Sequence, residues 1–448
     1  MARSVRPSER WIVLAAGFIV MSVAGAVFSW SLFTRPLVAL FGWTSVQVAL
    51  VFSLVIVFFA VGAVVGGIAH DRFGPRGVAF AGATLWGAGS LLAGLGLQRF
   101  GLGWLYLTYG AIGGFGCGMV YVVPGATITK WFPEERGLAN GVILGGYGLG
   151  SLAFNLVVGS LASFKRVANS TDAFVAARNA ATTGGRAFVV PPAIAQGDIA
   201  VIAHVFFWSG IVFLIVGGLT ALVLHPPPPG FTVAKAARGL ALERDFKPAE
   251  MLRTRAFYMM WLVVFVNATC GLALFSNAVP IYANVTGLTA AAATVAFGAL
   301  SAANGVGRFV WAWLSDVTGR RAALAVCFAL QGIALFWIAR GHDAAAMPLV
   351  FFATMLCFGG IFGIAPAVMA DLFGTRYLGE DYSFVLTAAA AAGILGPLTA
   401  ALVEDATGSV TAWLLPAALV MLVATIVPIL AKRPTLRLVS PASDRDEG

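Results

Sequence analysis

The sequence of 448 residues is 60% hydrophobic and only 10% charged, whereas a soluble globular domain carries about 25% charged residues. This composition excludes a soluble enzyme, a disordered chain and a small secreted domain held together by disulfides. The four cysteines lie scattered in apolar stretches without the spacing of a metal site, and we expect them to be ordinary core residues. The net charge of +9 does not indicate nucleic-acid binding, because the basic residues do not gather in a polar domain.

Apolar stretches long enough to cross a bilayer recur along the whole chain. A transmembrane helix needs about 20 apolar residues, and membrane strands would be shorter and would alternate in polarity. We therefore predict an all-α membrane protein that crosses the bilayer twelve times. The predicted spans are 11–32, 46–68, 78–97, 104–128, 137–162, 199–224, 257–279, 290–314, 322–339, 347–370, 384–403 and 410–430.

The basic residues lie mainly on one side of these spans. If the N-terminus is inside, 20 of the 28 Lys and Arg residues fall in inside segments and 7 in outside segments. Because cytoplasmic loops carry an excess of Lys and Arg, we expect both termini in the cytoplasm and a multi-pass protein of the inner (plasma) membrane. A cleaved N-terminal signal is the less favoured alternative, since its removal would leave an odd number of spans.

A polar stretch divides the chain into two sets of six spans. It contains four consecutive prolines, Pro226 to Pro229, and a cluster of charges. We predict an N-terminal bundle at 1–224, a cytoplasmic linker at 225–256, a C-terminal bundle at 257–432 and a cytoplasmic tail at 433–448. Segment 165–200 is predicted to be a long external loop, with no purpose assigned.

A short motif ends both the second and the eighth span. GIAHDRFGPR and AWLSDVTGRR share an acid (Asp71 and Asp316), a glycine three residues later and an arginine five residues later, at an offset of 245 residues. A weaker echo relates the fourth and tenth spans through Pro124 with Gly137 and Pro366 with Gly379. A capped tight turn would explain one copy, but not two in register. The repeat predicts two pseudo-symmetric six-helix bundles, with a binding site between them at the midplane.

On this motif the chain resembles the major facilitator superfamily, whose signature loop follows the second span. The resemblance covers nearly the whole chain. It implies the fold of that superfamily and alternating access by rocking of the two halves. It also implies that Asp71, Arg72 and Arg76 pair across a cytoplasmic gate without touching substrate, and we assign Asp316 and Arg320 of the second copy to the same gate.

Arg308 is a charged residue deep inside a predicted span. It precedes Asp316 by eight residues, or about 12 Å at 1.5 Å per residue. An arginine at such a depth costs at least about 2.5–3.5 kcal/mol, and no Asp or Glu lies within the core of any predicted span. Ser301, Asn304 and Arg308 share one helix face. We predict a water-lined site in which Arg308 binds a carboxylate. The alternatives are a structural arginine bonded to backbone carbonyls and an arginine that snorkels to the cytoplasmic face.

Three further residues are candidates for contact with the substrate. Tyr121 lies in a glycine-rich span, and its hydroxyl needs a partner when buried. That partner is either a substrate oxygen or a neighbouring backbone carbonyl. Phe358 and Phe362 are four residues apart on the tenth span and could form an apolar wall for a small organic anion; ordinary packing is the alternative.

Three other segments are similar to the oxalate/formate antiporter and monocarboxylate transporter group: 41–45 (FGWTS), 130–137 (KWFPEERG) and 304–308 (NGVGR). In that group the arginine of span eight binds the substrate carboxylate, which implies this role for Arg308, with Asn304 and Tyr121 in support. Oxalate-type members also carry a lysine in span eleven, in the context Thr-Ala-Lys-Gly. This chain reads Thr-Ala-Ala-Ala, with Ala389 at the position of the lysine.

One cation in the cavity fits one carboxylate, because a second carboxylate would be desolvated without a partner. We therefore expect a secondary transporter for a small monocarboxylate such as lactate, pyruvate or formate. We expect it to act as a monomer in the bilayer, with no enzyme activity, cofactor, metal or nucleic-acid partner. The alternatives are an exchanger of dicarboxylates such as oxalate and an anion sensor without transport. Proton symport, exchange for a counter-anion and uniport all stay open.

Overall fold

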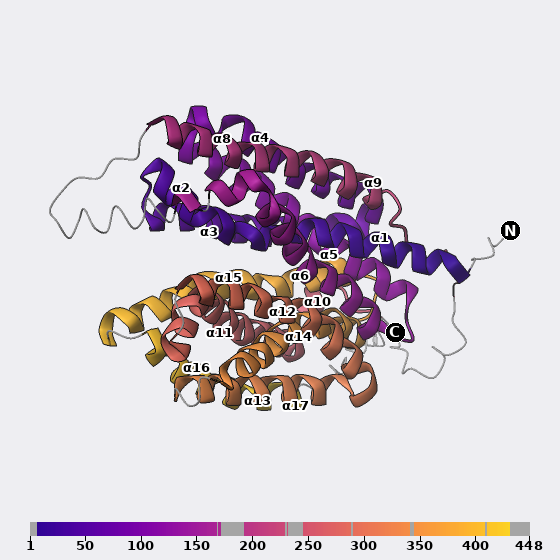
Figure 1. Ribbon diagram of the computed structural model, residues 1–448. Helices are drawn as coiled ribbons and strands as arrows, with labels where there is room; N and C mark the ends of the chain where they lie inside the picture. Colours follow the sequence, from indigo (N-terminus) through magenta and orange to yellow (C-terminus); the bar gives the residue numbers. More distant parts are fainter. Residues whose placement is uncertain are drawn as a thin grey trace, which may run out of the picture.

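The computed structural model describes residues 7–167, 169–171, 192–228, 231, 245–287, 290–340, 345–407 and 410–430. Among these residues there are helices and turns but no strand. Figure 1 shows the helices gathered in two bundles, with the N-terminal half in indigo to magenta above the C-terminal half in orange to yellow. The predicted all-α fold is therefore confirmed.

The N-terminal half contains the following helices: α1 (Pro7–Gly25), η1 (Ala26–Trp30), α2 (Ser31–Phe41), α3 (Ser45–Phe73), α4 (Pro75–Leu105), η2 (Tyr106–Gly113), α5 (Gly114–Trp131), α6 (Arg136–Ser160), α8 (Pro192–Val212), η3 (Phe213–Gly217) and α9 (Gly218–Ala221). The C-terminal half contains α10 (Pro248–Met251), α11 (Arg255–Thr286), α12 (Ala290–Thr318), α13 (Arg320–Ala339), α14 (Met347–Phe373), α15 (Leu378–Thr407), η5 (Val410–Trp413), α16 (Leu414–Ala424) and α17 (Ile426–Leu430).

Ten segments among the described residues are long and apolar enough to cross a membrane. One of them, Pro75–Trp131, covers two predicted spans, because two helices follow each other there with only the non-helical Gly101 between them. Gly101 has a φ of 63°, which glycine adopts without the steric cost that a side chain would add. α12 covers the predicted eighth span, so each of the twelve predicted spans lies largely on a helix. Part of the predicted external loop, 172–191, lies outside the described residues.

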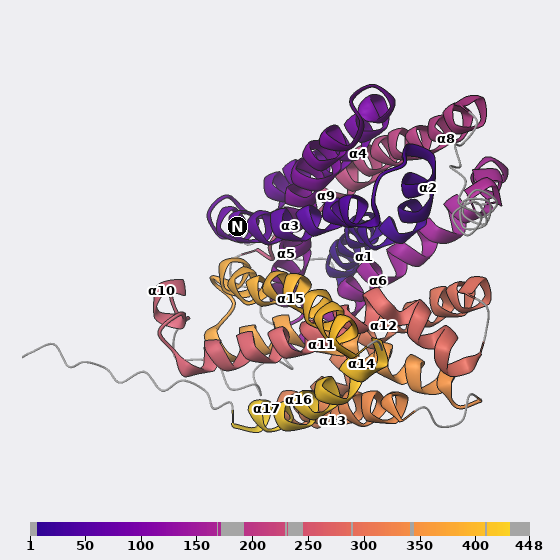
Figure 2. The same cartoon turned by 90° about the vertical axis from the view of Figure 1, so that its left-hand side faces the viewer.

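The two halves meet mainly along two helix pairs, α3 with α15 and α6 with α12, and α14 and α15 also contact α6 and α5. Figures 1 and 2 both show these pairs side by side. Glycines allow close approach of α6 and α12, since a Cβ on Gly148 would collide with the backbone of Gly305. We call the end formed by the α3–α4, α5–α6, α12–α13 and α14–α15 turns the gate end.

Candidate functional site

Arg308 lies in α12 where that helix packs against the other half, and it is only 3% exposed. Its Nε donates to Oδ1 of Asn304, one turn earlier, at 3.2 Å. Its Nη1 donates to the hydroxyl of Tyr121 on α5, also at 3.2 Å. Among the described residues no carboxylate forms an ion pair with it. The guanidinium is therefore buried beside neutral partners, one from each half.

Two aromatic rings cover the guanidinium. Its Cζ lies 5.3 Å from the ring centre of Tyr147 on α6 and 5.4 Å from that of Phe362 on α14. Tyr147 also packs edge-on against Tyr121, with ring centres 4.8 Å apart. Because the face of an aromatic ring attracts a cation, these rings stabilise a charge that no described carboxylate neutralises.

Two glycines of α14 hold α12 in place at the site. A Cβ on Gly359 would collide with the carbonyl of Asn304, and one on Gly363 would collide with the carbonyl of Arg308. The two helices therefore approach backbone to backbone beside the arginine. Small residues permit such close packing of transmembrane helices, and here they let the backbone of α12 lie against α14 at Asn304 and Arg308.

The structure brings together four of the five predicted substrate-binding residues. Asn304 and Tyr121 hydrogen-bond Arg308, and Phe362 contacts its guanidinium. Phe358 lies one turn away from Phe362 and packs edge-on against it at 5.7 Å. The ring of Phe358 fills the space beside Gly271 of α11. The side chain of Ser301, the first residue of the predicted polar stripe, lies outside the described residues.

Sequence reasoning missed Tyr147 and Tyr382. Tyr147 lies in the glycine-rich run GGYGLG of the fifth span, and such glycines are typical of helix packing surfaces. Tyr382 is buried near the start of α15, and its ring stacks on that of Tyr121 with centres 6.5 Å apart. An aromatic residue amid glycines was the available signal for Tyr147. Nothing in its own helix marks Tyr382.

The two motif aspartates lie at the gate end and bind backbone across the interface. Oδ2 of Asp71 accepts from the N–H of Glu380, in the first turn of α15, at 2.8 Å. The carboxylate of Asp316 accepts from the N–H groups of Gly137 and Leu138, in the first turn of α6, at 3.0 and 2.7 Å. Each carboxylate thus meets a helix N-terminus, where free N–H groups and the helix dipole favour an anion.

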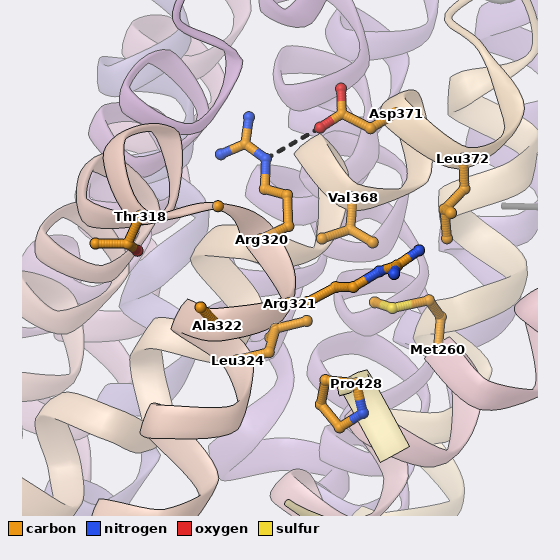
Figure 3. A pocket seen from close by; sticks show the side chains of 11 residues that line it. Met260, Thr318, Arg320, Arg321, Ala322, Leu324, Val368, Asp371, Leu372 and Pro428 are labelled. Carbon is orange, nitrogen blue, oxygen red and sulfur yellow. Dashed lines mark hydrogen bonds and ion pairs between the residues drawn. The ribbon is translucent and has the colours of Figure 1, made fainter. Parts of the chain in front are cut away.

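Asp371 on α14 extends these contacts. Its carboxylate binds Arg136 of the N-terminal half at 2.8 Å and Arg320 of its own half at 3.1 Å, and Figure 3 shows the second pair. Arg320 also binds Asp316 at 2.6 Å. Arg72 and Arg76 are exposed and form no ion pair with a described residue, so the pairing expected of these two arginines is not seen here.

Comparison with known proteins places these features in a family. The model of the Major Facilitator Superfamily matches residues 10–397 and 269–446. The oxalate:formate antiporter of Oxalobacter formigenes is 30% identical over 415 residues, which are 91% of this chain and 88% of the antiporter. The chain belongs to the Major Facilitator Superfamily. The predicted resemblance to this superfamily is thereby confirmed, and the chain is a membrane transporter and not an enzyme.

Two further similarities agree with this assignment to the Major Facilitator Superfamily. Apicoplast pyruvate carrier 1 of Toxoplasma gondii is 25% identical over 350 residues, covering 71% of this chain and 63% of the carrier. The crystal structure of the fucose:proton symporter of E. coli (N162A) superposes with a TM-score of 0.68 at 16% identity, covering 94% of this chain and 98% of the symporter. The second similarity supports the fold alone.

This superfamily member also has a cavity of about 440 Å³ at the gate end. α11, the start of α13, α14 and α17 form its walls, and Figure 3 shows Arg321 extending across it toward Met260. Arg308, Tyr121 and Tyr147 do not line this cavity. It adjoins the Arg320–Asp371 pair and is separate from the buried arginine.

Proposed function

We propose that this transporter moves a small monocarboxylate across the inner membrane by alternating access, with Arg308 as the residue that binds the carboxylate. The observation that carries the proposal is the state of Arg308, buried at the interface of the halves with only neutral hydrogen-bond partners among the described residues. Burying an unpaired charge is costly. A bound anion would remove that cost. A purely structural role gives no reason for an unpaired charge at this position.

The donor count of the guanidinium supports this role. Arginine has five N–H donors, and two hydrogen bonds to described residues engage Nε and Nη1 of Arg308. The remaining donors suit the two oxygens of a carboxylate, and a charge-assisted bond of this kind is worth about 1.5–3 kcal/mol. Asn304 and Tyr121 would hold the guanidinium in the orientation that a bidentate contact needs.

The relatives favour a carboxylate as the substrate. One is described as an oxalate:formate antiporter and another as a pyruvate carrier. A monocarboxylate is preferred here, because Ala389 stands where the resemblance predicts the lysine of oxalate-type members. The second candidate function, exchange of a dicarboxylate for another anion, rests on the 30% identity to the antiporter.

Alternating access would use the contacts at the gate end. There the motif aspartates and Asp371 join the halves, and the positive-inside distribution predicts that this end faces the cytoplasm. Breaking these contacts would open the Arg308 site to the cytoplasm. Rocking of two repeat-related bundles around a fixed midplane site is the motion that such an arrangement permits.

Ligand-induced thermal stabilisation of the purified protein tests the proposal. The wild type, Arg308→Ala, Arg308→Lys and the exposed control Arg340→Ala are compared against formate, lactate, pyruvate, oxalate and malate. A ligand at 100 times its Kd adds about 2.7 kcal/mol of stability. We expect monocarboxylates to stabilise the wild type and Arg340→Ala but neither Arg308 variant, since lysine lacks the bidentate geometry. Substrate uptake retained by Arg308→Ala contradicts the site, and stronger stabilisation by oxalate or malate favours the second candidate.

A further inference from the structure

Tyr382 has a buried hydroxyl that forms no hydrogen bond with the described part of the chain. The residue lies four positions into α15 and is 1% exposed. Among the described residues, no group meets hydrogen-bonding geometry with its hydroxyl. A buried tyrosine hydroxyl usually finds a partner. This one is therefore available to a ligand.

The hydroxyl of Tyr382 lies beside the Arg308 site. Its ring stacks on the ring of Tyr121 at an interplanar angle of 25°, and Tyr121 is the residue that hydrogen-bonds Arg308. The hydroxyl of Tyr382 lies close to that of Tyr121 but outside hydrogen-bonding geometry. Arg308 is near enough to act on the Tyr382 hydroxyl electrostatically. Because α15 packs against both α3 and α5 of the other half, Tyr382 belongs to the same interface as the arginine.

The two neighbouring hydroxyls each have a contact of their own. The hydroxyl of Tyr121 accepts from Arg308, and that of Tyr147 lies 3.8 Å from the Sγ of Cys117. A phenol offers one donor and two acceptor lone pairs, so Tyr382 can donate to a carbonyl oxygen or pair with a hydroxyl. With the carboxylate of a substrate on Arg308, the atom within reach of a second polar group is the oxygen on the adjacent carbon.

We propose that Tyr382 binds the C2 oxygen of the substrate and thereby selects 2-hydroxy and 2-oxo monocarboxylates over plain carboxylates of the same length. This inference rests on the proposed function and deepens it. A site built to hydrogen-bond a substrate oxygen discriminates against the analogue that lacks it, because the buried polar group is then left unpaired. A single neutral bond of this kind corresponds to about tenfold in affinity.

Matched pairs of ligands test the selection. Kd values are measured for lactate and propionate, which differ by the C2 hydroxyl, and for glycolate and acetate, which differ in the same way. We expect the wild type to bind lactate about tenfold more tightly than propionate. Tyr382→Phe keeps the ring and its stacking on Tyr121, so it should lose the preference for lactate while its Kd for propionate stays unchanged. Tyr282→Phe, a buried tyrosine that packs against Phe351 in the C-terminal half, should keep the wild-type preference.

The outcomes separate this inference from the proposed function. If the wild type binds lactate and propionate equally, or if Tyr382→Phe weakens both by the same factor, Tyr382 has only a packing role and the inference is wrong. If the wild type binds no monocarboxylate at all, the proposed function fails together with the inference. Binding that needs Arg308 but ignores the C2 oxygen overturns the inference alone.

Discussion

Asp71 and Asp316 accept backbone N–H groups from the first turn of a helix in the opposite half, Asp71 from α15 and Asp316 from α6. The two residues are 245 positions apart, and their contacts are related by the repeat. The glycine three residues after each aspartate has a positive φ, 83° at Gly74 and 89° at Gly319. The tight turn and the contact across the interface therefore belong to the same motif. The turn ends the helix, and the aspartate before it binds the other half.

The glycine at the start of each receiving helix makes this contact possible. A Cβ on Gly137 of α6 would collide with the carbonyl of Ala312, and one on Gly379 of α15 would lie 2.7 Å from Nδ1 of His70. These are the glycines of the weaker echo between the fourth and tenth spans. The strong repeat, with its aspartates, and the weaker echo, with its glycines, are therefore linked. The aspartate of one half approaches the helix of the other half closely because a glycine stands at that point.

Gly137→Ala should weaken closure of the gate end, because the added methyl group forces α6 away from α12. We expect spin labels at the exposed positions Arg76 and Arg321, introduced in a cysteine-free background, to show a larger share of long distances. Gly77→Ala, where a Cβ meets no atom within 4 Å, is the control. An unchanged distance distribution in Gly137→Ala contradicts the role of this contact.

Asp371→Asn should shift the same equilibrium by a modest amount. Its side chain and that of Arg136 are 29% and 25% exposed, and partly exposed ion pairs contribute about 0.2–1 kcal/mol each. We expect uptake rates to change a few-fold at low ionic strength and less at high salt, where screening weakens the wild-type pairs. Affinity for substrate measured by thermal shift should stay nearly constant. Arg136→Asp combined with Asp371→Arg should recover more of the wild-type rate than either change alone.

Tyr147→Leu should weaken substrate binding more than Tyr147→Phe does. The phenylalanine keeps a ring 5.3 Å from the Arg308 guanidinium, whereas leucine removes the attraction between ring and cation, worth about 0.5–2 kcal/mol. That range corresponds to about 2- to 30-fold in Kd. A direct measurement of Kd for a bound monocarboxylate checks the order of the two variants. If both variants raise the Kd by the same factor, the hydroxyl of Tyr147, and not its ring, supports binding.

Gly363→Ala should lower affinity although Gly363 has no polar side chain to offer a ligand. The new methyl group would meet the carbonyl of Arg308, and overpacking of this kind costs about 1–3 kcal/mol or displaces the helix. We expect a raised Kd for the substrate together with a lower melting temperature. Gly159→Ala, where a Cβ meets no atom within 4 Å, should change neither. A normal Kd in Gly363→Ala would mean that α12 is not held by α14 at this point.

Much of the fold was predictable, because each membrane span is visible in the sequence as a long apolar stretch. Length and apolarity place the twelve helices, and a repeated turn motif indicates two halves. Asn304 and Arg308 were also within reach, because residues four apart on one helix share a face. Their hydrogen bond is an interaction within a single helix.

Which helices contact each other could not be predicted from the sequence. Tyr382 comes next to Tyr121 only because α15 packs against α5, and helical periodicity says nothing about which helices become neighbours. The role of Asp371 could not be predicted for the same reason. It ends an apolar span without any motif, yet it joins Arg136 to Arg320. The exposure of Arg72 and Arg76 could not be foreseen either, because the motif repeats its residues but not the surroundings of each copy.

Ala389→Lys tests the reasoning from charge that separates the two candidate substrates. The wild type offers Arg308 to one carboxylate, and a second carboxylate would be desolvated without a partner, which costs several kcal/mol. A lysine at position 389, where the resemblance places it in oxalate-type members, should supply that partner. We expect Ala389→Lys to gain stabilisation by oxalate and to lose stabilisation by formate, since a second cation would repel the first when a single negative charge is bound. Ala389→Met, a neutral side chain of similar length, controls for the change in volume. If oxalate already stabilises the wild type as strongly as it stabilises Ala389→Lys, another residue supplies the second cation to the Arg308 site, and the preference for monocarboxylates is wrong.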